Sequence, residues 1–190
     1  MKRNVRFCIY LLCAELLLCC CALRATTLER MSLARMAQAA QVIVRARCIS
    51  NSTGWAVGEI WTFTTFEAGE TWKGDSTARA PGMITIRLLG GTVGALTSHV
   101  SGVPRFHPGE DVLIFLEPTS RNDFSVLGWA QGTFRIRRDP RTGEQIVTQD
   151  TAAFATFNPK TRRFETAGIR NLPLAAFRER VQSAIARNGE

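Results

Sequence analysis

The sequence predicts a mainly β protein, a small antiparallel barrel with a short helix before it and a closing helix after it. Short strand-like stretches recur at intervals of roughly 10 to 25 residues, and helical periodicity occurs only near the two ends. A turn at Pro108-Gly109 precedes an uninterrupted apolar run from Val112 to Leu116. These features favour an OB-like (oligonucleotide/oligosaccharide-binding) or inhibitor-like barrel, and a β-sandwich is the alternative.

The first 25 residues have the layout of a secretory signal peptide. A basic start precedes an apolar run over residues 7–22, and small or polar residues follow near Ala25. We therefore expect residues 1–25 to be removed and residues 26–190 to form a single barrel-like domain. The expected location of this domain is exported, in the periplasm or outside the cell.

Three alternatives exist for this leader: a buried N-terminal helix, a retained membrane anchor, and a lipid attached at Cys19. Glu15 places a charge inside the apolar run, which weakens insertion into a membrane. Leu18 stands directly before Cys19, where lipoprotein signals usually carry a small residue. The cleaved signal peptide is the interpretation that agrees best with the sequence.

Removal of the leader changes both the cysteine count and the charge. Five of the six cysteines precede residue 26, which leaves Cys48 alone in the mature chain. An intramolecular disulfide or a cysteine-based metal site is then excluded. The leader also contains four basic residues and one acid, so its removal lowers the formal net charge from +8 to +5. This charge permits contact with anionic surfaces without identifying one.

The mature chain opens with a predicted helix and a strand hairpin. Residues 26–29 (Thr-Thr-Leu-Glu) match a capping box, and apolar residues at helical spacing extend the helix to about Ala40. Alternation then predicts a strand over residues 42–48, a turn over 51–54 and a second strand over 60–66. These two strands are expected to pair with each other.

The middle of the chain contains the predicted central strand. A third strand is expected over residues 83–89, and residues 92–108 have no clear period, although Phe106 indicates packing over the core. Residues 112–116 are apolar at both parities, so both faces of this strand should be covered.

The last third predicts two strand halves, a hairpin and a helix. The strand halves lie within residues 124–138, with a bulge or bend at Gly132, and the hairpin returns through residues 146–149. Residues 150–170 look irregular. The closing helix has an apolar stripe that consists of Leu174, Phe177, Val181, Ala184 and Ile185.

A string of motifs runs through residues 28–138. It consists of Ala40-Gln41-Val42-Ile43-Val44-Arg45-Ala46-Arg47, Trp72-Lys73-Gly74, Leu89-Gly90-Gly91, Gly102-Val103-Pro104-Arg105-Phe106-x-x-Gly109-Glu110 and Gly128-x-x-Gln131-Gly132-x-Phe134. The string resembles that of a set of uncharacterised bacterial exported proteins. Its residues are mostly glycine, proline and apolar positions, so the resemblance implies a fold and brings no activity, cofactor or catalytic residue.

One candidate partner-binding face emerges from the alternation over residues 134–138. It places Arg135 and Arg137 on the outward side of a strand. Together with Trp61 and Trp129 on a neighbouring strand, this face would stack against and neutralise a single strand of nucleic acid. A solubilising outer surface is the simpler explanation of the same pattern, and export from the cytoplasm argues against nucleic acid as the partner.

The two histidines, His99 and His107, do not form a recognisable catalytic or metal motif. Neither a Gly-x-Ser-x-Gly sequence nor a cysteine with a motif-spaced histidine occurs. Glu110 and Asp111 would complete a site with His107 only if folding gathered them.

The sequence therefore favours an exported, non-enzymatic binding module of the bacterial cell envelope or secretome, without catalytic residues, cofactor or metal. A protein or an anionic envelope polymer is the expected partner, and membrane contact is expected only through an uncleaved leader. One alternative is a secreted protease inhibitor or accessory factor whose barrel rim enters a partner's cleft. The other is an enzyme or metal site that uses His99 or His107.

Cleavage of the leader near Ala25 is the first testable prediction, because a basic start, an apolar run and small residues occur in that order. The intact mass of protein recovered from the periplasm or the medium should correspond to a chain that begins near residue 26. A full-length species in those fractions would contradict it.

Overall fold

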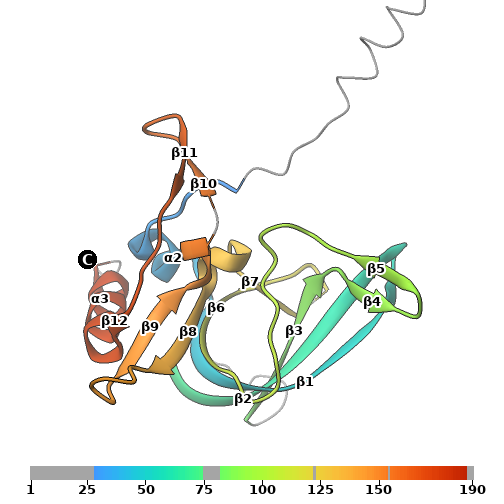
Figure 1. Cartoon of the computed structure of the whole chain (residues 1–190), viewed down its shortest axis with the longest axis horizontal. Coiled ribbons are helices and arrows are strands. Elements are labelled where there is room, and N and C mark those ends of the chain that lie inside the picture. The colour runs from blue at the N-terminus through green and yellow to red at the C-terminus, as the bar shows by residue number, and fades with distance from the viewer. Residues whose placement is uncertain (1–27, 75–81, 122, 154, 188–190) are drawn as a thin grey trace, which may run out of the picture.

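A computed structural model of the chain describes residues 28–74, 82–121, 123–153 and 155–187. The expected signal peptide, residues 1–25, lies outside the described residues. The fold is mainly β, with one large mixed sheet that partly closes into a ring, a short helix near the start and a helix at the C-terminal end (Figure 1). Among the described residues, none of the helices combines the length and the apolar character needed to span a bilayer.

The elements follow one another in a simple order. They are α2 (Leu33–Ala39), β1 (Val42–Ala56), β2 (Glu59–Lys73), β3 (Met83–Leu89), β4 (Gly91–Val93), β5 (Leu96–Ser98), β6 (Asp111–Pro118), β7 (Phe124–Val126), the 3-10 helix η2 (Trp129–Gly132), β8 (Thr133–Arg138), β9 (Gln145–Gln149), the 3-10 helix η3 (Asp150–Ala153), β10 (Ala155–Asn158), β11 (Arg163–Thr166), β12 (Leu172–Pro173) and α3 (Leu174–Ala186).

The ring consists of five strands in the order β1-β2-β3-β7-β6, because β6 also pairs with β1. The β1–β6 pairing is antiparallel and runs from Val42↔Leu116 to Arg47↔Asp111. Strands β3 and β7 are parallel and share the single pair Ile86↔Phe124, so this is the weakest seam of the ring. From β6 the sheet also continues outward through β8, β9 and β12.

Strand β6 separates two hydrophobic cores. Val112, Ile114 and Leu116 face the core inside the ring, and Leu113 and Phe115 face a second core under the helices. All five side chains are 0% exposed. The prediction of a central strand with both faces covered is therefore confirmed.

The second core joins the outer sheet to α2 and α3 (Figure 1). The ring centroids of Phe115 and Phe134 are 5.2 Å apart, and those of Phe134 and Phe177 are 4.7 Å apart, so aromatic packing links β6, β8 and α3. Phe177, Val181 and Ala184 of the predicted apolar stripe are buried. The closing helix is thus confirmed in position and in the face that it buries.

The first helix begins later than its capping box predicts. Ser32 is its N-cap, and its hydroxyl accepts a hydrogen bond from the Arg35 N–H at 3.2 Å. The chain before it is extended instead, because the Arg30 N–H donates to the Phe157 carbonyl at 2.9 Å and the Met31 N–H donates to Oε1 of Gln131 at 2.7 Å. Tertiary hydrogen bonds therefore replace the expected first helical turn.

Strands β1 and β2 do form a hairpin, but its turn is not at residues 51–54. The pairing continues to Ala56↔Glu59, and the turn is Val57-Gly58. Polar side chains of the extended part find partners across the sheet: the Thr64 hydroxyl donates to Asn51 Oδ1 at 2.6 Å. These contacts satisfy residues whose type alone favours a turn.

Two further expectations for the second half need correction. Gly132 ends a 3-10 helix and is not a strand bulge; a Cβ there would lie 2.3 Å from the Leu127 carbonyl oxygen, so only glycine fits. The segment expected to be irregular contains the β10–β11 hairpin, which pairs Ala155↔Thr166 through Asn158↔Arg163.

Replacement of Phe115 by alanine should destabilise the protein by about 3–5 kcal/mol, because it removes a fully buried ring from the centre of the second core. Denaturant unfolding measures this difference. Phe164→Ala is the control, since that ring is 64% exposed, and it should lose no more than about 1 kcal/mol. A midpoint near wild type for Phe115→Ala would contradict the assigned role of β6.

Candidate binding site

Trp61 and Trp129, which were predicted to share a binding face, line the same pocket of about 240 Å³. The pocket lies outside the ring, over the seam between β3 and β7. Its lining residues are Trp61, Arg87, Leu89, Thr119, Ser120, Arg121, Ser125 and Trp129.

Strand alternation explains why these side chains face outward. On β3, Ile86 and Leu88 are buried inside the ring, so the intervening Arg87 and the following Leu89 face the pocket. Trp61 is on β2 and follows the buried Ile60. The loop between β6 and β7 supplies the opposite wall.

Trp61 is held on two sides. Its indole N–H donates to the Ala56 carbonyl at 3.1 Å, and the Arg87 guanidinium lies over its ring, 5.2 Å from the centroid. Arg87 is only 7% exposed and forms an ion pair with Asp123, whose carboxylate also accepts from the Thr119 hydroxyl. The pocket is therefore preorganised, with the charge of Arg87 already neutralised.

Trp129 adopts a strained backbone conformation. Its φ is 55° and follows a φ of 59° at Gly128, so two consecutive residues are left-handed. Tryptophan rarely occupies this region, and such strain concentrates at functional sites. The next residue, Ala130, donates its N–H to the Gly102 carbonyl at 2.9 Å, which keeps the strained turn against the loop that precedes β6.

Arg121 provides the available charge of the pocket. Within the described part of the chain its guanidinium makes no ion pair, and its side chain is exposed. Its backbone N–H donates to the Thr119 hydroxyl at 3.2 Å, which fixes the loop. Two indole faces beside the Arg121 guanidinium suit a ligand with a flat ring and a negative charge.

Arg135 and Arg137, the other predicted members of the face, do not line this pocket. The interpretation of Arg135 as an outward charge is wrong, because its side chain is only 16% exposed. It donates from Nε and Nη2 to the Asp150 carboxylate at 2.9 Å each and forms an ion pair with Glu110. Arg137 is exposed, as expected.

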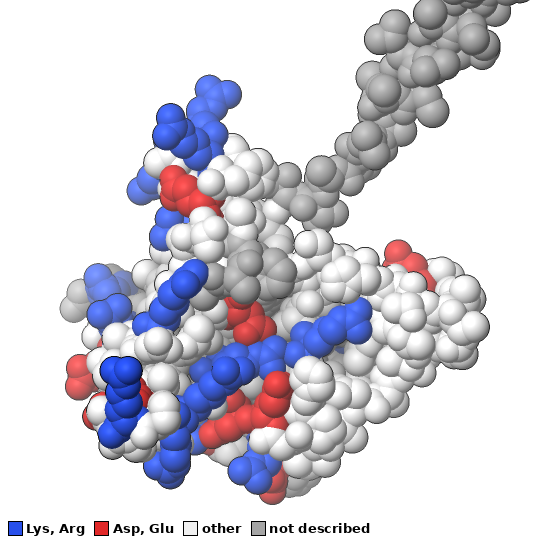
Figure 2. Space-filling view, in the orientation of Figure 1, with Lys and Arg blue, Asp and Glu red and all other residues white. Residues whose placement is uncertain are grey.

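The contacts of Arg135 hold the loop before β6 against the sheet. Its Nη2 donates to the Arg105 carbonyl at 2.7 Å, and its guanidinium lies 5.0 Å from the centroid of Phe106. Burial alone would lower the pKa of Arg135, but its hydrogen bonds to the Asp150 carboxylate and the charges of Asp150 and Glu110 outweigh burial and raise the pKa. On the face of the molecule seen in Figure 2, basic and acidic side chains lie next to one another across the middle.

The pKa of Glu110, one of the two acids that pair with Arg135, also depends on its partners. Burial alone would raise the pKa of Glu110, but the hydrogen bond from the His107 N–H and the charge of Arg135 outweigh it. The pKa of Glu110 therefore lies below its ordinary value, which keeps the carboxylate charged opposite Arg135.

Residues 92–108 begin with the β4–β5 hairpin, and the loop that follows this hairpin packs on the ring core. Pro104 and Phe106 are buried, and the Phe106 ring meets the Phe66 ring edge-on with centroids 5.0 Å apart. This confirms the packing expected from Phe106.

The two histidines of that loop contact different partners. Arg105 Nη2 lies 3.2 Å from His99 Nδ1, whereas His107 Nδ1 lies 3.3 Å from Glu110 Oε1. Among the residues that the structure describes, no group of three His, Cys, Asp or Glu side chains is arranged to hold a metal ion. Cys48 is fully buried, and burial raises the pKa of its thiol, as for a small core residue.

A larger cavity of about 490 Å³ lies at the base of the β10–β11 hairpin, but its buried amides are already occupied. The Gln131 side chain accepts from the Met31 N–H and donates to the Glu29 carbonyl at 2.8 Å. The Gln149 side chain donates to the Gln131 carbonyl at 2.6 Å. Because these amides already connect chain segments, they are not available to a ligand. The pocket lined by Trp61 and Trp129, called the tryptophan pocket below, is therefore the better candidate site.

Sequence reasoning missed Arg87 and Arg121 as members of the site. For Arg87 a signal existed, since alternation over residues 83–89 already places it on the outward side with the pocket residues. Arg121 had no local signal, because only the closure of the ring brings the β6–β7 loop to β2 and β3.

Comparison with known proteins adds no assignment: the chain matches no family model, no curated protein and no solved structure.

Arg135→Met should destabilise the protein by about 2–4 kcal/mol, since it leaves two partly buried carboxylates, Asp150 and Glu110, without their cation. Arg137→Met is the matched control on the same strand, where the exposed side chain should be replaced at a cost within about 0.5 kcal/mol. Urea unfolding of both variants measures the difference. Equal stability of the two would show that the Arg135 network contributes nothing.

Proposed function

We propose that this chain is an exported, non-enzymatic binding module of the bacterial cell envelope or secretome. In this proposal the pocket of Trp61 and Trp129 holds one unit of an anionic envelope polymer. The observation that carries the proposal is a pocket that places two indoles, Trp61 held by its N–H bond to Ala56, beside the Arg121 guanidinium, which makes no ion pair among the described residues. The leader-like residues 1–25 and the motif string support the exported location.

The finer description of the fold as an OB-like barrel belongs to the same proposal. The ring order β1-β2-β3-β7-β6, closed by β1–β6 pairing, supports it. OB-type barrels bind oligonucleotides and oligosaccharides on their second and third strands and on the loops beside them. The tryptophan pocket lies at the equivalent place, on β2, β3 and the β6–β7 loop.

The pocket's size and chemistry favour a polymer of acidic sugars. Its volume of about 240 Å³ is below the roughly 300–1,000 Å³ of sites that enclose whole small molecules, so it fits one ring of a longer chain. The apolar face of a sugar ring would stack on an indole, and its carboxylate would accept hydrogen bonds from Arg121. Hydroxyls of Thr119, Ser120 and Ser125 would meet the ring hydroxyls.

A secreted protease inhibitor or accessory factor is the second candidate, because two neighbouring hairpin tips expose apolar side chains. Trp55 and Val57 are 55% and 76% exposed, and Leu96 of β5 is 59% exposed. The φ of Val57 is 52°, which is unfavourable for a β-branched residue. An inhibitor would insert these tips into a cleft, whereas a polymer-binding module would use the tryptophan pocket.

A polyuronate such as alginate is the probe that tests the first candidate, with uncharged dextran for comparison. Wild type should bind alginate in a salt-dependent manner, and Trp61→Ala or Arg121→Ala should weaken binding by about tenfold. Isothermal titration calorimetry measures the affinity, and thermal unfolding confirms that the variants remain folded.

Trp55→Ala is the matched control, because it removes an indole from the exposed hairpin tip and leaves the pocket intact. It should bind alginate as wild type does. If Trp55→Ala weakens binding and Trp61→Ala does not, alginate contacts the hairpin tips, and the tryptophan pocket is not the polymer site. Absence of any binding to alginate would contradict an acidic sugar as the ligand.

A further inference from the structure

The β10–β11 hairpin, residues 155–166, projects from the body as an arm (Figure 1). Its two strands form a sheet of their own, separate from the large sheet. An isolated two-stranded hairpin is only marginally stable in water, so a projecting hairpin indicates a role other than stabilising the fold. The composition of its outer end indicates what that role is.

Three exposed cations lie at the outer end of the arm: Lys160, Arg162 and Arg163. None of them forms an ion pair within the described part of the chain. The arm's carboxylate, Glu165, instead accepts hydrogen bonds from Asn158 at 2.9 Å and from the Thr161 hydroxyl at 2.5 Å, and pairs with Arg30. Figure 2 shows the resulting cluster of basic side chains at the tip.

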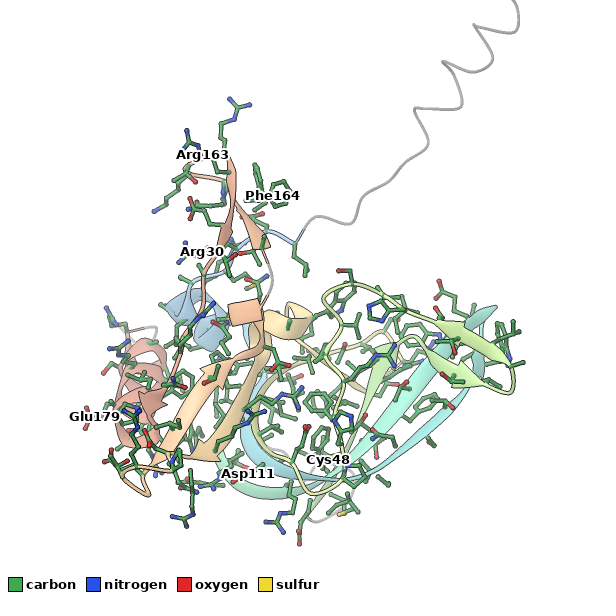
Figure 3. All side chains as sticks on the ribbon, in the orientation of Figure 1. Arg30, Cys48, Asp111, Arg163, Phe164 and Glu179 are labelled. Carbon is green, nitrogen blue, oxygen red and sulfur yellow. The ribbon has the colours of Figure 1, made fainter. Side chains whose placement is uncertain are left out.

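An exposed aromatic ring accompanies these cations. Phe164 is 64% exposed, and its inner contact is an edge-on one with Phe157, whose ring centroid is 5.5 Å away. Figure 3 shows Arg163 and Phe164 at the outer part of the arm and Arg30 at its base. Basic residues beside an exposed aromatic ring are the composition of protein surfaces that lie in a membrane interface.

The arm also lies where the leader joins the fold. The Phe157 N–H donates to the Leu28 carbonyl at 3.0 Å, and the Arg30 N–H donates to the Phe157 carbonyl at 2.9 Å. The apolar run of the leader ends at residue 22, and the six residues from there to Leu28 span at most about 20 Å. Until its predicted removal near Ala25, a leader inserted in the bilayer would therefore keep the arm close to the bilayer surface.

We infer that the arm docks on an anionic phospholipid surface, with its cations at the headgroups and Phe164 in the interfacial layer. This contact does not require the leader, whose removal near Ala25 is predicted, and it is independent of the proposed polymer site. Lys160 lines the cavity of about 490 Å³, whereas Arg162, Arg163 and Phe164 line neither of the cavities described above. A flat phospholipid surface therefore suits these three residues better than a soluble polymer held in a cavity. Each basic residue near an anionic leaflet strengthens the attraction by about fivefold.

Trypsin tests this inference, because it cleaves after the three cations themselves. The full chain is incorporated into vesicles of phosphatidylglycerol or of phosphatidylcholine, and the cleavage rate is measured at each site. The matched control sites are Arg137, Arg138 and Arg141, which are also exposed, on the β8–β9 hairpin. Phosphatidylglycerol should slow cleavage in the arm at least fivefold and leave the control hairpin unchanged, and phosphatidylcholine should protect neither.

Two changes probe the nature of the contact in the same assay. Raising NaCl from about 0.1 to 0.5 M should remove most of the protection, because the Debye length falls below 10 Å. Phe164→Ser should reduce the protection at least twofold, whereas Ile49→Ser, which alters another exposed apolar residue, should not. Equal cleavage of the arm on both lipids, or protection that neither salt nor Phe164→Ser reduces, would overturn the inference.

Discussion

The fold depends on one strand that must be apolar on both sides. Strand β6 closes the ring against β1, continues it into β7, and starts the outer sheet through β8. Its five central side chains fill two cores at once, so neither the ring nor the layer of helices can form without it. At about 25 cal/mol per Å² of apolar surface removed from water, burial on two faces concentrates the stabilisation of both layers in a few residues.

Strand β6 belongs to two layers, the ring and the layer that packs under the helices. Polar contacts between β8 and the loop before β6 hold these layers in register. Arg135 provides these contacts from β8, joining Asp150, Glu110 and the Arg105 carbonyl. A partly buried cation with several acceptors specifies one arrangement of the loop before β6, since any other would leave carboxylates desolvated and unpaired. On an isolated strand, the alternation around Arg135 resembles that of a solvated surface. The structural role of Arg135 therefore depends on contacts with distant residues.

The two proposed interaction surfaces, the tryptophan pocket and the arm, lie outside the two cores that β6 separates. The tryptophan pocket covers the β3–β7 seam, where a single parallel pair closes the ring, and the Arg87–Asp123 ion pair spans that seam. The arm lies beyond the large sheet and is held by hydrogen bonds to residues 28–30. A module arranged in this way would hold a polymer on one surface while the arm contacts a lipid surface with another.

The sequence by itself determined the elements whose apolar pattern is local: the central strand 112–116, the third strand, the β1–β2 pairing and the stripe of α3. Periodicity reports which side chains are buried, and burial dominates the stability of these segments. Tertiary structure decided what depends on distant partners. Hydrogen bonds to Phe157 and Gln131 keep residues 30 and 31 out of the first helix, which therefore begins later in the chain. Ring closure places Arg121 beside Trp61 and Trp129. Arg135 was buried by Glu110 from the loop before β6 and by Asp150 from η3, which no periodicity in its own strand encodes.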